Sequence, residues 1–209
     1  MTPPMPADDS MQQLDDETRA LVRLSAVITA GSEIEIRAAM AYAAARVRAV
    51  WIEELLLQTY LFAGFPRALN ATREWRRLQP SPIDSDGRRG ADWRSDGAAA
   101  CERVYGDMYV RLRSNIRSLH PLLDEWMIVE GYGKVLSRRA LDLPRRELCI
   151  VAACAAAGQD RQLHSHLHGA LNVGVAPGTV DSAIDAISDL IGAERTGAVR
   201  MLWTRVKGK

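Results

Sequence analysis

Residues 141–175, LDLPRRELCIVAACAAAGQDRQLHSHLHGALNVGV, decide the fold of this chain. Asp142 followed by Pro144 is typical of a helix start, with the aspartate as cap and the proline in the first turn. Small apolar residues dominate positions 145–157, so we expect this helix to be buried on nearly all sides. Gly158 suits the helix end. A second helix is predicted over residues 160–173, and the pattern therefore indicates a pair of helices joined by a short turn.

Glu147 lies inside the first, apolar helix, where a carboxylate is costly unless it is paired or hydrogen-bonded. His166 follows nineteen positions later, at the edge of the buried face of the second helix. Two antiparallel helices could bring these side chains together as an acid/base pair. The alternative is a structural role, in which Glu147 pairs with Arg145 or Arg146 and fixes helix packing.

The other histidines of this region allow a second interpretation. His164 and His168 are four residues apart on one helix face, a spacing that suits two imidazole ligands of a metal. No third ligand has a matching spacing, although His120 could approach in space. We therefore expect no metal.

Around these residues the chain resembles the carboxymuconolactone decarboxylase and alkylhydroperoxidase-like superfamily. The resemblance rests on the following segments: Arg-Glu-Leu at 146–148, His166, Ala-Leu-Asn at 170–172, Gly-Val at 174–175, and an aromatic-Gly-x-Val step at Tyr132, Gly133 and Val135. The peroxidase branch has a CxxC between its Glu and its His, but here the two cysteine positions hold Gln159 and Gln162. Without a thiolate there is no peroxidatic nucleophile. The decarboxylase-like branch, which lacks the CxxC, is the one that remains.

Composition limits the function classes. The chain has 209 residues, 47% of them hydrophobic and 25% charged, with a net charge of +1, which is ordinary for a globular protein and argues against nucleic-acid binding. The odd number of three cysteines indicates a reducing compartment. No apolar run is long enough for a membrane span and no signal peptide is recognised, so we expect a cytoplasmic protein that binds no membrane.

Residues 14–31 repeat residues 141–158 with seven identities in eighteen positions. We therefore expect a disordered tail over 1–13, a degenerate first repeat over 14–78, a linker or surface loop over 79–97, and a second, decarboxylase-like module over 98–209. Single helices are predicted over 98–119 and over 122–130, the latter ending at a glycine-flanked turn. Ser32 and Glu35 form a predicted capping box.

The first repeat lacks the acid and base, because Ala20 stands where the second has Glu147 and a small residue replaces His166. It keeps a closing segment, residues 50–71, that resembles the same family. This segment is either core packing or, through Gln58, Tyr60 or Phe65, one wall of a pocket that opens in the second module.

The resemblance implies an all-α fold of helix pairs in a ring-like homo-oligomer, here a trimer that imitates a hexamer of single-repeat subunits. It also implies a cofactor-independent decarboxylation of a small anionic lactone such as 4-carboxymuconolactone. In this interpretation His166 is general acid, Glu147 orients it, and Arg146 holds a substrate carboxylate. Tyr132, His164, Gln58 and Tyr60 would form the pocket wall. The alternatives are another proton-transfer or lactone-processing enzyme on this scaffold, and a non-catalytic assembly or binding protein.

Overall fold

The computed structural model describes residues 13–83 and 92–208, and every regular element in these ranges is helical, which confirms the all-α prediction for this part of the chain. The elements, in chain order, are α1 (Asp16–Ala30), α2 (Glu33–Ala44), α3 (Ala49–Leu78), α4 (Trp93–Tyr105), η2 (Gly106–Met108), α5 (Tyr109–Leu119), α6 (Pro121–Trp126), η3 (Met127–Leu136), α7 (Leu143–Ala157), α8 (Asp160–Asn172) and α9 (Pro177–Lys207). Within the described ranges, no helix is both apolar and long enough to cross a bilayer.

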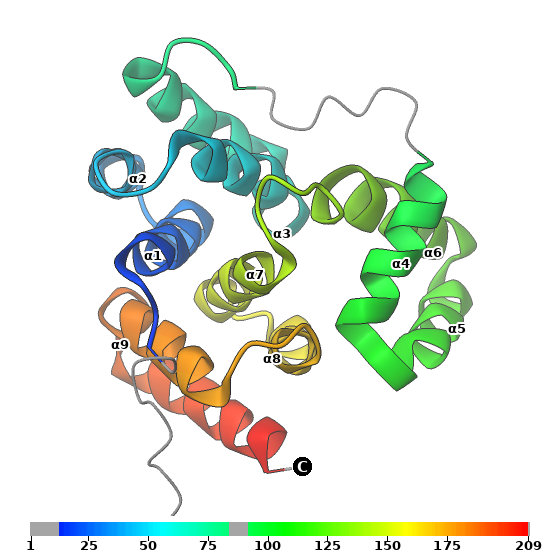
Figure 1. The fold of residues 1–209 in the computed structure, drawn as a ribbon. Coiled ribbons are helices and arrows are strands. Elements are labelled where there is room, and N and C mark those ends of the chain that lie inside the picture. Colours follow the sequence, from blue (N-terminus) through cyan, green and yellow to red (C-terminus); the bar gives the residue numbers. More distant parts are fainter. Residues whose placement is uncertain (1–12, 84–91, 209) are drawn as a thin grey trace, which may run out of the picture.

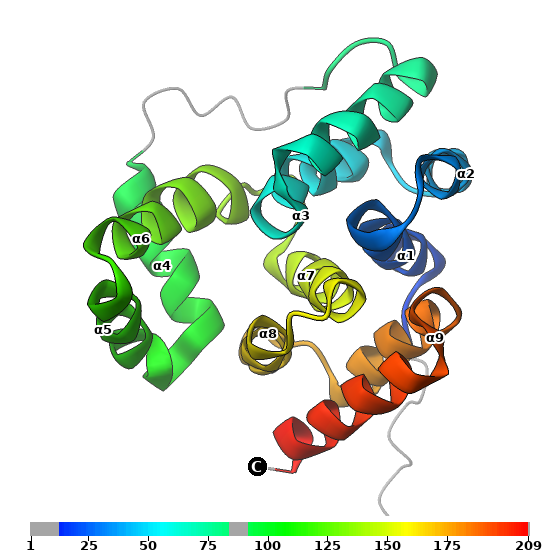
Figure 2. The same ribbon diagram turned by 180° about the vertical axis from the view of Figure 1, so that it is seen from behind.

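Helix α7 forms the centre of the molecule, surrounded by α1, α3, α8 and α9 (Figure 1). Its sequence explains this place, because Asp142 caps it by accepting from the Arg145 amide and its apolar residues cover every face. Gly158 ends the helix in the left-handed conformation, with φ of 69°, so that α8 folds back on α7. The α4–η3 unit, with α5 and α6, stands on the side of α8 away from α1 (Figure 2).

Matching local geometry occurs in the two halves of the chain. Helices α1 and α7 each have fifteen residues, and their caps, Asp15 and Asp142, share an extended backbone. Helices α3 and α9 are each broken at a glycine, with φ 81° and ψ 163° at Gly64 and φ 79° and ψ 164° at Gly192. This conformation is open almost only to glycine. The breaks turn each long helix around the helix pair that it covers.

The region before α7 differs from the prediction. Instead of one helix over 98–119, the chain forms α4, a short 3₁₀ turn and α5, because Gly106 adopts φ 52° and ψ −131° and breaks the helix. Helix α4 begins at Trp93, inside the expected linker, and is capped by Asp92. The expected tail and most of the remaining linker fall on residues 1–12 and 84–91, which lie outside the described residues.

The glycine-flanked turn expected after residue 130 is also absent from the structure. The chain stays helical as the π-helix η3 up to Leu136, and α4 crosses it closely. A Cβ on Gly133 would lie 2.1 Å from the carbonyl oxygen of Trp93. The glycine therefore serves helix packing rather than a turn.

Candidate active site

The structure brings Glu147 of α7 and His166 of α8 together. Oε2 of Glu147 lies 2.8 Å from Nδ1 of His166, and the two side chains are 0% and 6% exposed. The alternative pairing of Glu147 with an arginine is wrong, because Arg145 pairs with Asp142 and Arg146 points elsewhere. Since Nδ1 is engaged by the carboxylate, Nε2 is the histidine nitrogen left for a bound molecule.

Space for this contact depends on Gly169, one turn after His166. A Cβ there would lie 2.6 Å from Oε2 of Glu147 and 2.7 Å from a methyl carbon of Val104. The second oxygen, Oε1, is buried and has no hydrogen-bond partner within the described residues. A polar atom in this state costs about 1–3 kcal/mol, and such costs concentrate at functional sites. The pair is therefore a candidate for chemistry rather than for packing alone.

His166 lines a cavity of about 510 Å³. Its ring meets Phe62 edge-on, with centroids 5.5 Å apart, and Tyr105 at 6.3 Å. The wall comes from both halves of the chain, since α3 and α8 face the α5–α6–η3 segment. Its residues are Leu61, Phe62, Tyr105, Leu112, Ile116, Leu123, Trp126, Met127, Glu130, Gly131, Tyr132, Leu136, Arg161, Gln162, Ser165 and His166.

Two tyrosines stand beside the pair. Burial raises the pKa of Tyr132 well above its ordinary value, and burial likewise raises the pKa of Tyr105. The two phenols are hydrogen-bonded to each other, and in their protonated form they are donors as well as acceptors. Tyr132 lies in the cavity wall, as the sequence predicted, whereas Tyr105 was missed because nothing in its sequence context separates it from an ordinary core tyrosine.

Arg146 does not reach the cavity, so the prediction that it holds a substrate carboxylate is wrong. Its guanidinium is 0% exposed and donates to Glu54 at 2.6 Å and to the Gln58 side chain at 3.3 Å. Burial lowers the pKa of Arg146, and Glu54 opposes this shift. Gln58 in turn donates to the backbone oxygen of Arg146, so it too is a buried packing residue and no pocket wall.

Tyr60 and His164 also lie outside the lining of this cavity. Tyr60 stacks on Phe65 with centroids 4.8 Å apart and donates to the backbone oxygen of Glu130 at 3.4 Å. His164 lines a neighbouring cavity of about 530 Å³ with His168. The wall that the first half supplies is made by Leu61 and Phe62 instead, which lie within the turn of helix before the break at Gly64.

The two outer histidines contact each other, with ring centroids 4.8 Å apart. Among the residues that the structure describes, no cluster of three or more His, Cys, Asp or Glu side chains is suited to a metal ion. His120 caps α6 through its Nδ1, which accepts from the Leu122 amide.

Arg161 is the cation that the sequence interpretation missed. It lies on the first turn of α8, exposed, five residues before His166, and lines the same cavity. No carboxylate within the described ranges forms an ion pair with it, unlike Lys134, which pairs with Glu130 of the cavity wall. The helical spacing of positions 161, 162, 165 and 166 was the available signal, since they share one face of α8.

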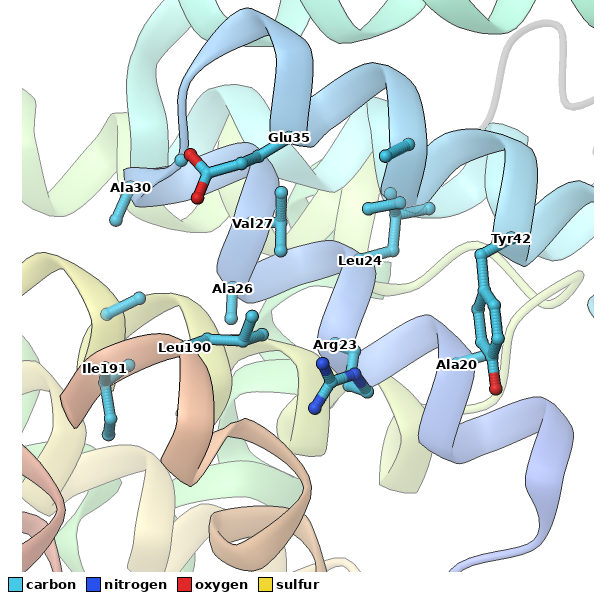
Figure 3. A pocket seen from close by; sticks show the side chains of 14 residues that line it. Ala20, Arg23, Leu24, Ala26, Val27, Ala30, Glu35, Tyr42, Leu190 and Ile191 are labelled. Carbon is cyan, nitrogen blue, oxygen red and sulfur yellow. The ribbon is translucent and has the colours of Figure 1, made fainter. Parts of the chain in front are cut away.

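A larger cavity, of about 560 Å³, lies between α1, α2 and α9 (Figure 3). Ala20 lies in its wall, and the charged groups there are engaged: Arg23 pairs with Asp189, and Glu35 forms the predicted capping box with Ser32. It contains no pair comparable to Glu147 and His166. The smaller cavity is therefore the candidate active site.

These features define an all-helical protein with a buried carboxylate–histidine pair at the wall of a cavity. Residues 125–202, which contain both members of the pair, match the carboxymuconolactone decarboxylase family. Over this segment the chain is similar to that family, in line with the resemblance that the sequence predicted.

Two fungal relatives are similar over a wider region. Peroxisomal protein 2 of Schizosaccharomyces pombe is 33% identical over 137 residues, which cover 63% of this chain and 64% of the relative. Peroxisomal protein 2 of Saccharomyces cerevisiae is 26% identical over 159 residues, covering 62% of this chain and 56% of the relative. The chain thus spans less than two thirds of the length of these relatives.

Proposed function

We propose that this chain is a cofactor-independent enzyme that uses Glu147 and His166 for proton transfer. In its most specific form, the proposal is a decarboxylase, a lyase acting on a small anionic lactone that resembles 4-carboxymuconolactone. The observation that carries the proposal is the buried hydrogen bond of Glu147 to Nδ1 of His166 at the wall of a cavity. A histidine held in this way presents a defined nitrogen to a substrate.

The proposed reaction uses this geometry in the following way. The bond to the departing carboxylate breaks, carbon dioxide leaves, and the electron pair moves through the conjugated lactone to its carbonyl oxygen. Protonated Nε2 of His166 stabilises that oxygen and then gives its proton to carbon, while Glu147 stabilises the imidazolium and fixes the ring. Arg161, and not Arg146, is the cation that pairs with the anionic group of the substrate. Tyr132 adds a neutral donor in the cavity wall.

The binding partner in this proposal is a small anionic molecule, and no further cofactor is required by the scheme. Other proton-transfer chemistry on the same pair, such as isomerisation or hydrolysis of a lactone, is the nearest alternative. A non-catalytic assembly or binding role is the second alternative, because the names of the two fungal relatives state a compartment and no reaction.

The proposal includes a tandem repeat with modules at 14–78 and 98–209. The matching helix caps and glycine breaks of the two halves support this repeat. A trimer that imitates a six-module ring would follow from two modules per chain. A cytoplasmic location is retained as the prediction, with the peroxisome, named for the relatives, as the alternative that a fluorescent fusion decides.

The test is carbon dioxide release from 4-carboxymuconolactone by the purified protein. The variants His166→Ala and Glu147→Gln should each lower the rate on the order of 10²-fold or more. His164→Ala is the matched control, since this histidine lies two residues away in another cavity. If the folded protein released no carbon dioxide, 4-carboxymuconolactone would be excluded as the substrate. If both variants kept the rate of the unmodified protein, Glu147 and His166 would be excluded as the catalytic pair.

A further inference from the structure

The cavity at His166 is mainly apolar. Its lining includes a continuous set of hydrocarbon and aromatic side chains from three directions: Leu61 and Phe62 of α3, Leu112 and Ile116 of α5, and Leu123 and Trp126 of α6. A volume of about 510 Å³ is in the range of roughly 300–1,000 Å³ that buries a drug-sized ligand. A compact lactone ring with polar arms would leave much of this apolar surface in contact with water.

The cavity wall has few charged groups, and they differ in whether another charge neutralises them. Glu130 is neutralised by Lys134 at 2.8 Å, and the Glu147 carboxylate lies behind the histidine ring, to which it is bonded. Arg161 is exposed and forms no ion pair with the described residues. Among the described lining residues, a bound molecule therefore meets the uncompensated positive charge of Arg161 at the solvent side, while the rest of the wall is mainly apolar.

We infer that the molecule that binds at His166 is an amphiphilic acid, with one anionic group at Arg161 and an apolar body, larger than a lactone ring, between Phe62 and the α6 residues Leu123 and Trp126. This inference rests on the proposed function for the reaction, and it replaces the compact lactone of its most specific form by an acid with a larger apolar body. An anion at Arg161 forms a charge-assisted hydrogen bond. An apolar body that displaces water from the wall gains affinity with each carbon buried.

Binding of unreactive probes tests the inference without any turnover. Isothermal titration calorimetry would compare butanoate, octanoate and dodecanoate with the matching primary alcohols and with octanedioate. Affinity should rise about fourfold for each methylene buried, until the cavity is filled. Octanoate should bind about tenfold or more tighter than octanol, because only the acid pairs with Arg161.

Two neighbouring leucines provide a matched pair of variants. Leu123 lines the cavity and Leu122 does not, yet they are 49% and 44% exposed, so both substitutions leave the core intact. Leu123→Glu should abolish the dependence on chain length, whereas Leu122→Glu should leave it unchanged. Arg161→Gln should remove the preference for the acid over the alcohol.

Affinities that do not change with chain length, or octanedioate binding tighter than octanoate, would overturn the inference. An Arg161→Gln variant that still prefers the acid would overturn the place of the anion. Carbon dioxide release separates the two proposals. Chain-length-dependent binding without release from any acid refutes the reaction and keeps the binding class. Carbon dioxide release from 4-carboxymuconolactone, together with binding that does not depend on chain length, would refute the binding class and keep the reaction.

Discussion

The buried ion pair of Glu54 and Arg146 gives a quantitative test of how this molecule is held together. Both side chains are 0% exposed, and the Arg146 Nη2 lies 2.6 Å from the Glu54 Oε2. Arg138 also donates to Glu54, at 2.8 Å. Glu54→Gln removes the negative charge and leaves Arg146 charged inside the protein. Breaking a buried pair in this way costs about 3–5 kcal/mol of unfolding free energy.

For a chain of this length, 1 kcal/mol corresponds to roughly 2–4 °C in Tm, so Glu54→Gln should lower Tm by roughly 6–20 °C. Thermal and urea unfolding, followed by circular dichroism, would measure the change. The double variant Glu54→Leu/Arg146→Met should lose much less than the two single variants together, because neither member of the Glu54–Arg146 pair is left charged without the other.

The single variant Arg146→Met tests whether this arginine is a core residue or a substrate ligand. If Arg146→Met changed the unfolding free energy by less than about 1 kcal/mol, and instead raised KM for an anionic substrate, Arg146 would be a substrate ligand. Arg146 would then be no core residue, and Arg161 would not be the cation that binds the substrate anion.

Three further predictions concern the site and its surroundings. Gly169→Ala should destabilise the fold by roughly 1–3 kcal/mol and displace Glu147, because the added carbon has no space. Gly197→Ala, which has open space around it, is the control and should be neutral or stabilising. Urea titrations would measure both variants. Hydrogen bonds from Arg113 hold the pKa of Asp124 below its ordinary value. The stability that the Asp124 carboxylate contributes is therefore present at neutral pH and is lost as the pH falls through that lowered pKa. Asp124→Asn should weaken this loss of unfolding free energy at acid pH, measured by urea titrations at a series of pH values. Burial raises the pKa of Cys149 to about 12, so the folded protein should react with iodoacetamide at pH 8 far more slowly at this thiol than the unfolded chain, as mass spectrometry would measure.

Local sequence signals predicted the helix pair and its contact well. Asp142 and Gly158 mark the ends of α7 through short-range capping, and the sequence itself carries this information. The contact of Glu147 with His166 was also accessible, because a short turn allows few arrangements of two neighbouring helices.

Contacts between distant segments were not accessible. Glu54 precedes Arg146 by 92 residues, so a buried cation next to Glu147 was assigned to substrate rather than to a partner on another helix. Phe62 of α3 lines the cavity and meets the ring of His166, although the two residues lie in different halves of the sequence. The break at Gly106 was missed because apolar residues keep a helical period on both sides of it.

Histidine ¹⁵N NMR spectroscopy tests the central claim, that Glu147 and His166 form a prepared acid/base pair, most directly. In the neutral ring, we expect Nδ1 of His166 to carry the proton and Nε2 to have the shift of a bare acceptor nitrogen. The assignment comes from the signal lost in His166→Ala, and Glu147→Gln should shift it, whereas Glu130→Gln should not. A proton on Nε2, or a spectrum that Glu147→Gln leaves unchanged, would contradict the pair.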